Sequence, residues 1–121
     1  MKYHHLIEDD AGVSRFADGE IALELKDFAP PAPPLYLSAL EPATQLAFLI
    51  LPPSWQGASH PSPARQVALC LSGTLLVEAG DGSRREIRTG DIWRMEDTQG
   101  AGHETRVIGE EEVRLAMVQL A

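Results

Sequence analysis

The chain has 121 residues, of which 44% are apolar, and a formal net charge of −8 at pH 7. This length suits one domain with a hydrophobic core. The acidic balance argues against nucleic acids and anionic membranes as partners, because both attract basic surfaces. One cysteine excludes an internal disulfide, the N-terminus lacks a signal-peptide core, and the apolar run at residues 46–51 is too short to span a bilayer, so we expect a cytoplasmic protein.

The first part of the chain predicts short strands joined by turns. Residues 9–12, Asp-Asp-Ala-Gly, are a turn signal, and residues 13–16 follow as a short strand. The Asp18-Gly19 dipeptide predicts a tight hairpin turn into residues 20–26. That run alternates apolar and polar residues, so we expect one buried face and one solvent-exposed face.

A proline-rich segment, residues 29–34, cannot be helix or central strand, because proline lacks the amide donor. We interpret it as an extended edge segment crossing between sheets, in preference to a peptide ligand for a partner domain. Residues 35–38 form a short strand candidate. Residues 45–51 are apolar at both alternating sets of positions, which predicts a strand covered on both sides before Pro52-Pro53 ends it.

The second half predicts regular short strands after a loop at residues 54–63. Glycine-containing turns separate the strands, and no segment keeps a helical period. The expected strands are residues 66–72, 74–79, 84–88, 92–95, 103–108 and 112–120. Many short strands with Gly and Pro turns are typical of an all-β sandwich or barrel.

Two histidines, His60 and His103, bracket these strands, and their spacing resembles the cupin family of small double-stranded β-barrels with jelly-roll topology. The first cupin motif has a His-x-His pair, three or four residues, a Glu, six residues and a Gly. Gly73 matches the glycine, Gln66 stands at the glutamate position, and His60 and Ser62 stand at the two histidine positions.

The second cupin motif is also partly kept. Gly90-Asp91 and then His103 follow the family's order, whereas Val107 replaces the expected asparagine and residues 96–102 replace the usual proline-x-glycine. The resemblance implies an all-β cupin jelly roll over residues 1–121 as a single domain. Residues 1–53 would hold N-terminal strands and the proline-rich crossover, and residues 54–121 both motifs.

The resemblance also implies a site inside the barrel. Family members bind Fe, Mn, Ni or Zn through three imidazoles and a carboxylate, and His60, Gln66 and His103 are the matching metal candidates here. Two imidazoles and a neutral amide are a weak cage, so a loosely held divalent metal, aided by an acid such as Glu96, and a metal-free polar pocket both stay open. The expected pocket residues are Trp55, His60, Ser62, Gln66, Cys70 and His103.

Alternation refines this expectation. If Gln66 points inward, then Ala68 and Cys70 follow it, while Leu69 and Leu71 point outward. If His103 points inward, Thr105 and Val107 do so too. Cys70 then reads as an inert packing residue, and outward apolar positions favour a homodimer, with the N-terminal strands extending a sheet or clasping a second subunit.

The resemblance to cupins, taken with these residues, implies three candidate functions. The first is a small-molecule-binding cupin without strong catalysis, such as a sensor. The alternative is a metal-dependent dioxygenase, isomerase or lyase acting on a small polar metabolite, with Gln66 ligating or orienting a water and Glu96 moving protons. Glu96 and Asp97 are both candidates for a general base or ligand, but capping of turn amides is the commoner role of a carboxylate pair in a loop. A metal-free epimerase with His60 as base ranks last, because the matched motifs offer no acid partner.

Overall fold

The computed structural model describes residues 1–121 and contains strands but no helix, so no helix is present that could span a membrane. The strands are β1 (Lys2–Glu8), β2 (Ser14–Glu20), β3 (Glu24–Lys26), β4 (Leu35–Leu37), β5 (Ala43–Leu51), β6 (Gln56–His60), β7 (Gln66–Ser72), β8 (Thr74–Ala79), β9 (Arg84–Arg88), β10 (Ile92–Met95), β11 (His103–Ile108) and β12 (Val113–Leu120). The all-β prediction is confirmed.

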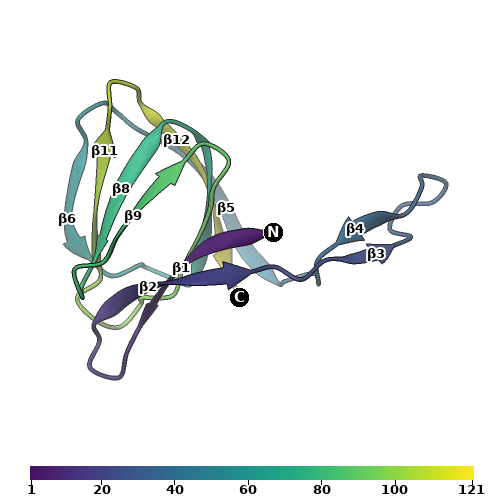
Figure 1. Cartoon of the computed structure of the whole chain (residues 1–121), viewed down its shortest axis with the longest axis horizontal. Helices are drawn as coiled ribbons and strands as arrows, with labels where there is room; N and C mark the ends of the chain where they lie inside the picture. Colours follow the sequence, from purple (N-terminus) through teal and green to yellow (C-terminus); the bar gives the residue numbers. More distant parts are fainter.

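Two sheets face each other as a jelly-roll-like pair that does not close into one continuous barrel (Figure 1). The six-stranded sheet has the order β2-β1-β10-β7-β12-β5, and the four-stranded sheet has the order β6-β11-β8-β9. All strand pairs are antiparallel except β1 with β10. This topology leaves β5 and β2 as the edge strands of the larger sheet.

Side chains alternate between the interior and the outer surface along the central strands. In β7, Gln66, Ala68 and Cys70 are buried, whereas Leu69 and Leu71 are exposed. His103, Thr105 and Val107 of β11 are buried in the same way. The inward directions expected from the sequence are therefore confirmed, because the period of two is kept without interruption over each of these segments.

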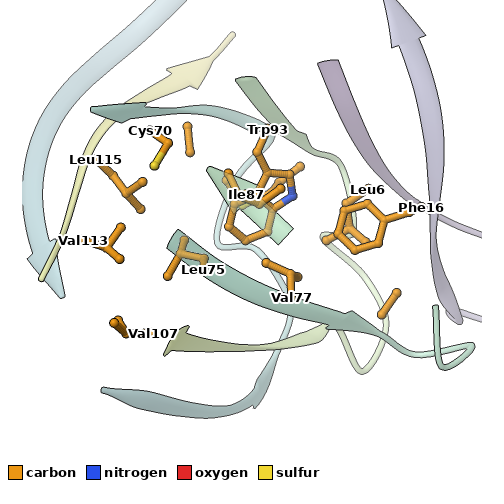
Figure 2. Packing of buried hydrophobic residues seen from close by; sticks show 13 residues of the cluster. Leu6, Phe16, Cys70, Leu75, Val77, Ile87, Trp93, Val107, Val113 and Leu115 are labelled. Carbon is orange, nitrogen blue, oxygen red and sulfur yellow. The ribbon is translucent and has the colours of Figure 1, made fainter. Parts of the chain in front are cut away.

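The interior holds one hydrophobic cluster of 13 buried residues between the sheets (Figure 2). It is apolar because each strand directs its apolar set inward: Leu6 from β1, Leu75 and Val77 from β8, Trp93 from β10 and Leu115 from β12. Burial of these side chains stabilises the fold at about 25 cal/mol per Å² of apolar surface. The cluster leaves space toward β5 and β6, where the candidate site lies.

The N-terminal strands differ from the sequence-based expectation. Residues 2–8 form β1. The sequence did not predict this strand, because its composition is polar and only Leu6 of it is fully buried. The Asp18-Gly19 dipeptide lies within β2 and makes no turn. The hairpin turn lies at residues 9–13, which confirms the turn predicted at residues 9–12. There the Asp9 carboxylate accepts hydrogen bonds from two turn amides, and Gly12 has a φ of 80°.

Strands β3 and β4 pair only with each other and project from the jelly roll as an arm (Figure 1). The proline-rich residues 29–34 lie at the tip of this arm and do not cross between sheets, and every residue of β3 is exposed rather than half-buried. Prolines suit such a tip because it makes no ladder hydrogen bonds. A further strand, β6, occupies part of the expected loop by pairing with β11.

Candidate functional site

A cavity of about 350 Å³ lies between the two sheets. Its walls come from β5, β6, β7, β8, β10, β11 and β12, so the strands of both sheets shape it. The lining residues are mostly apolar: Leu49, Leu51, Trp55, Pro63, Leu75, Trp93, Met95, Leu115 and Met117, with His60, Gln66, His103, Thr105 and Gln119 as the polar members. A mainly apolar wall with few polar groups is typical of a small-molecule site.

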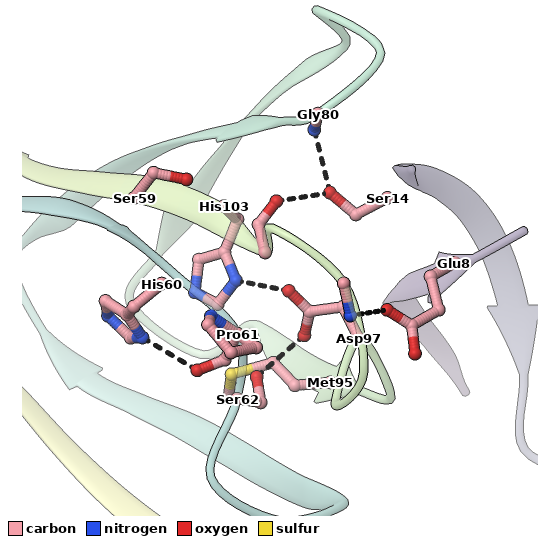
Figure 3. Close-up of polar contacts among 12 residues, drawn as sticks. Glu8, Ser14, Ser59, His60, Pro61, Ser62, Gly80, Met95, Asp97 and His103 are labelled. Carbon is pink, nitrogen blue, oxygen red and sulfur yellow. Dashed lines mark hydrogen bonds and ion pairs between the residues drawn. The ribbon is translucent and has the colours of Figure 1, made fainter. Parts of the chain in front are cut away.

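His103 is held by a buried carboxylate. It begins β11 and is 3% exposed, and its Nδ1 lies 2.6 Å from Oδ2 of Asp97, which is fully buried (Figure 3). The Ser62 hydroxyl donates to the other oxygen of that carboxylate over 2.7 Å. The Asp97 carboxylate thus accepts a hydrogen bond from Nδ1–H of His103, and in this tautomer the lone pair of the neutral ring is on Nε2, on the side away from Asp97.

His60 presents the same tautomer by a different contact. Its Nδ1 lies 2.9 Å from the carbonyl oxygen of Pro61, and a carbonyl only accepts, so Nδ1 carries the proton. His60 ends β6 directly opposite His103, and the two ring centroids are 5.2 Å apart. The cavity is therefore lined by two imidazoles whose Nε2 atoms take no part in these contacts, and His60 is exposed whereas His103 is buried. Such a pair can accept hydrogen bonds from a ligand, and Nε2 of His103 can accept a proton while Asp97 holds the ring.

A glycine brings the backbone of the two histidines together. Gly102 has a φ of 82°, and a Cβ at this position would lie 1.9 Å from the carbonyl oxygen of His60. Its own carbonyl accepts a hydrogen bond from the Ser14 hydroxyl at 2.7 Å. Only glycine permits both the left-handed backbone and the close approach here. The Gly102-His103 dipeptide thus sets the position of the β11 histidine against β6.

Gln66 and Trp93 also line the cavity near the two histidines. Gln66 is 5% exposed and its amide nitrogen has only a weak contact, 3.5 Å from the sulfur of Met95. Trp93 lies edge-on to His103 with centroids 5.3 Å apart, and its indole N–H is the buried side-chain group without a hydrogen-bond partner. The amide of Gln66 is therefore free to rotate toward a polar ligand atom.

The structure brings together four of the six expected pocket residues, namely Trp55, His60, Gln66 and His103. Ser62 lies behind the wall and orients Asp97, because its hydroxyl donates to that carboxylate. Cys70 packs in the core and directs its thiol at the carbonyls of Ser72 and Gly73. Burial, with help from the charge of Asp91, raises the pKa of the Cys70 thiol, which suits an inert packing residue.

Glu96, the candidate proton carrier, lies on the opposite face of its segment from the cavity. Its carboxylate contacts His5, Arg65 at 2.8 Å and Arg94 at 3.6 Å. Burial alone would raise the pKa of Glu96, but hydrogen bonds from His5 and Arg65 and the charge of Arg94 outweigh burial and lower it. We therefore replace the expectation that Glu96 serves the pocket: the alternation after Met95 turns it outward, where it links strands.

Asp97 is the functional residue that the sequence reasoning did not select. The sequence favours a cap for turn amides over a general base or ligand at this position, yet Asp97 is fully buried and binds His103 and Ser62. The signal was present in the period of two, because Asp97 continues the inward set of Trp93 and Met95. An acid on the buried side of a strand end needs a partner, and His103 is that partner.

The residues present do not fit the three-imidazole and one-carboxylate cage that the resemblance implies. No group of three or more His, Cys, Asp or Glu residues that could hold a metal ion is present in the structure. Ser62, at one histidine position, is already engaged with Asp97, and Gln66 supplies a neutral amide in place of a carboxylate. Two imidazoles and an amide are one imidazole and one carboxylate short of that cage, so they do not reproduce it.

Comparison with known proteins agrees with this architecture. The family model described as "Cupin domain" matches residues 47–119, which is more than half of the chain. This chain belongs to the cupin family. The matched region holds both histidines, Gln66 and Asp97, so the candidate site lies within the cupin domain proper, while the arm precedes it.

Solved cupin structures have the same fold. A Cupin 2 conserved barrel domain protein from Salinispora arenicola is 14% identical, with a TM-score of 0.53 over 82% of this chain and 76% of that one. A cupin domain from Schizosaccharomyces pombe is 12% identical, with a TM-score of 0.51 over 89% and 73%. A cupin domain from Bordetella pertussis is 17% identical, with a TM-score of 0.50 over 63% and 79%. No curated protein matches the chain.

Proposed function

We propose that this cupin binds a small, mainly apolar molecule that carries at least one hydrogen-bond donor. The observation that supports this proposal is the pair of imidazoles with engaged Nδ1 atoms at one end of an otherwise apolar cavity. Two neighbouring acceptors favour a hydroxyl, an amide or a protonated acid on the ligand. The Trp and Leu side chains around them favour an aromatic or aliphatic body.

The fixed tautomers add selectivity to this pocket. A ligand without a donor that covers Nε2 of His103 would leave this atom unpaired, at a cost of about 1–3 kcal/mol. A ligand with a donor removes that cost and keeps the apolar contacts. The site therefore discriminates between molecules of equal size by the presence of a hydroxyl or amide, as between p-cresol and p-xylene.

Intrinsic fluorescence tests this proposal directly, because the chain has two tryptophans and both Trp55 and Trp93 line the cavity. A panel of small alcohols, phenols, amides and carboxylic acids is titrated, each beside its analogue without the donor. We expect donor-bearing members to change the emission and to bind at least about tenfold more tightly than their analogues. Native mass spectrometry of freshly purified protein searches for a co-purified ligand.

Variants locate the binding site. His103→Ala should weaken binding of the best ligand at least about tenfold through loss of one hydrogen bond. Glu104→Ala is the matched control, because Glu104 follows His103 on β11 but is exposed and lies outside the cavity. Equal affinities of both variants, or no response from any panel member, would contradict the proposal.

Elemental analysis tests the metal-dependent alternative. Stoichiometric Fe, Mn, Ni or Zn that is lost in the His60→Ala, His103→Ala double variant would favour the enzyme instead.

A further inference from the structure

We propose that Glu8 and Ser14 of the N-terminal hairpin are positioning residues of the ligand site, because they fix the loop that joins Asp97 to His103. This site loop, residues 96–102, connects β10 to β11. Neither Glu8 nor Ser14 lines the cavity. Both act through backbone groups of the site loop, and their role in binding rests on the proposed function, since it concerns the same histidine acceptors.

The site loop does not hold its own shape. No backbone–backbone hydrogen bond joins two residues within 96–102. The loop also contains Gly100 and Gly102, and glycine widens the range of conformations open to a chain. Nevertheless it places Nδ1 of His103 only 2.6 Å from Oδ2 of Asp97. Contacts from other elements must therefore impose the shape of the loop.

Glu8 supplies the first of these contacts, and it points at the site loop in Figure 3. It ends β1, and its two carboxylate oxygens accept hydrogen bonds from the amides of Gln99 and Gly100, each at 2.9 Å. Bonds to a charged acceptor are roughly twice as strong as neutral ones. A Cβ on Gly100 would lie 1.9 Å from the carbonyl oxygen of Gly12, so the hairpin turn also packs closely on the loop.

Ser14 fixes the end of the loop that enters β11. It is 1% exposed, and its hydroxyl donates to the carbonyl of Gly102 and accepts from the amide of Gly80, both at 2.7 Å (Figure 3). The carbonyl of Gly102 and the amide nitrogen of His103 belong to one planar peptide unit. The hydrogen bond from Ser14 therefore sets the plane from which His103 enters its strand.

These contacts bear on ligand selection because hydrogen bonds tolerate little displacement. A shift of about 1 Å in the site loop would lengthen the bond between His103 and Asp97 beyond its favourable range and turn Nε2 of His103 away from a ligand donor. The apolar wall comes from other strands, so its contacts with a ligand would remain. Loss of the loop contacts should therefore lower the preference for donor-bearing ligands and retain the affinity for their apolar analogues.

The first test compares Glu8→Ala with Asp9→Ala. The Asp9 carboxylate also accepts two backbone amides, but both belong to the hairpin turn. Tryptophan fluorescence measures the preference for a donor-bearing ligand over its analogue, such as p-cresol over p-xylene. This preference should fall from at least about tenfold in the wild type to below about threefold in Glu8→Ala and stay unchanged in Asp9→Ala.

Ser14→Ala should reduce the preference in the same way. Its matched control is Ser83→Ala, because the Ser83 hydroxyl accepts the amide of Phe16 and thus also joins β2 to the turn between β8 and β9, without contact to the site loop. Glu8→Gln keeps the size of the side chain but offers one acceptor oxygen for two amides. It should give an intermediate loss, and it tests the same contact if Glu8→Ala does not fold.

A second readout needs no ligand. The Nδ1–H proton of His103 is buried between two electronegative atoms, so it should give a resolved low-field signal in proton nuclear magnetic resonance. The signal should persist in the wild type and in both controls. It should be lost or move upfield in Glu8→Ala and Ser14→Ala, while circular dichroism shows that the fold is retained.

Equal preferences and equal signals in Glu8→Ala and Asp9→Ala would overturn the positioning role, even if both variants are less stable than the wild type. So would a loss of affinity that p-cresol and p-xylene share equally. If no panel member binds to the wild type, the proposed function fails, and the signal of His103 by itself then decides whether Glu8 and Ser14 hold the site loop.

Discussion

Gly102 shows how one residue without a side chain positions the site. Its backbone is left-handed, and the carbonyl of His60 occupies the place of a Cβ. A left-handed backbone costs a non-glycine residue about 1–2 kcal/mol, and displacement of His60 adds to that cost. Gly102→Ala should therefore lower the free energy of unfolding by more than about 2 kcal/mol and weaken ligand binding, as measured by chemical unfolding and tryptophan fluorescence.

Gly82 supplies the matched control for this prediction. It has a similar φ of 86°, but nothing lies within 4 Å of the place where a Cβ would stand. Gly82→Ala should therefore lower the free energy of unfolding only by the cost of a left-handed alanine, about 1 kcal/mol, and leave ligand binding unchanged. Equal losses of stability in the two variants would show that the approach of His60 contributes nothing.

At the scale of elements, Glu96 joins three parts of the six-stranded sheet. Its carboxylate contacts His5 on β1, Arg65 just before β7 and Arg94 on β10. These contacts connect the N-terminal hairpin to the central strands, and they lower the pKa of Glu96 despite its partial burial. A carboxyl with a lowered pKa in the folded state stabilises the fold above its ordinary value, 4.5 here, and loses this contribution as the pH falls through the folded value.

The variant Glu96→Gln tests this connection. It should lower the free energy of unfolding by about 1 kcal/mol at pH 7, where wild-type Glu96 is charged. The difference from wild type should shrink as the pH falls below 4.5 and disappear below the lowered pKa of folded Glu96, because Glu96 is then neutral in both states. Glu112→Gln, whose partner Arg114 is exposed, should change little at any pH. A difference that stays constant between pH 7 and about pH 3 would contradict the ionic role.

For the whole molecule, the cavity between the sheets couples folding to ligand binding. A ligand that binds only the folded chain raises the unfolding midpoint. At about 100 times its dissociation constant, p-cresol should raise the midpoint of the wild type by several degrees, as followed by circular dichroism. Glu8→Ala should show a smaller rise at the same concentration, and Asp9→Ala the full rise. An unchanged wild-type midpoint would argue that p-cresol does not bind the folded chain.

Much of the second half could be predicted from the sequence. The strands from residue 66 to residue 108 have the expected bounds, because Gly turns and alternation act locally and need no distant partner. The spacing of His60, Gln66 and His103 likewise indicated the cupin family, and these three residues line the cavity together with Trp55. The N-terminal hairpin was misplaced because Asp18-Gly19 is compatible with a turn, and only pairing with β1 extends the strand through it.

What the sequence determined by itself is the all-β class, the inward set of each central strand and the two histidines, since these follow from period, turn chemistry and spacing. Tertiary structure alone decided what those histidines face. It buried Asp97 beside His103, turned Glu96 outward and placed Ser62 behind the wall. It also left the arm and the outer face of β5 exposed within one chain. These outcomes depend on contacts between residues far apart in sequence, and a local pattern carries no information about which strands become neighbours.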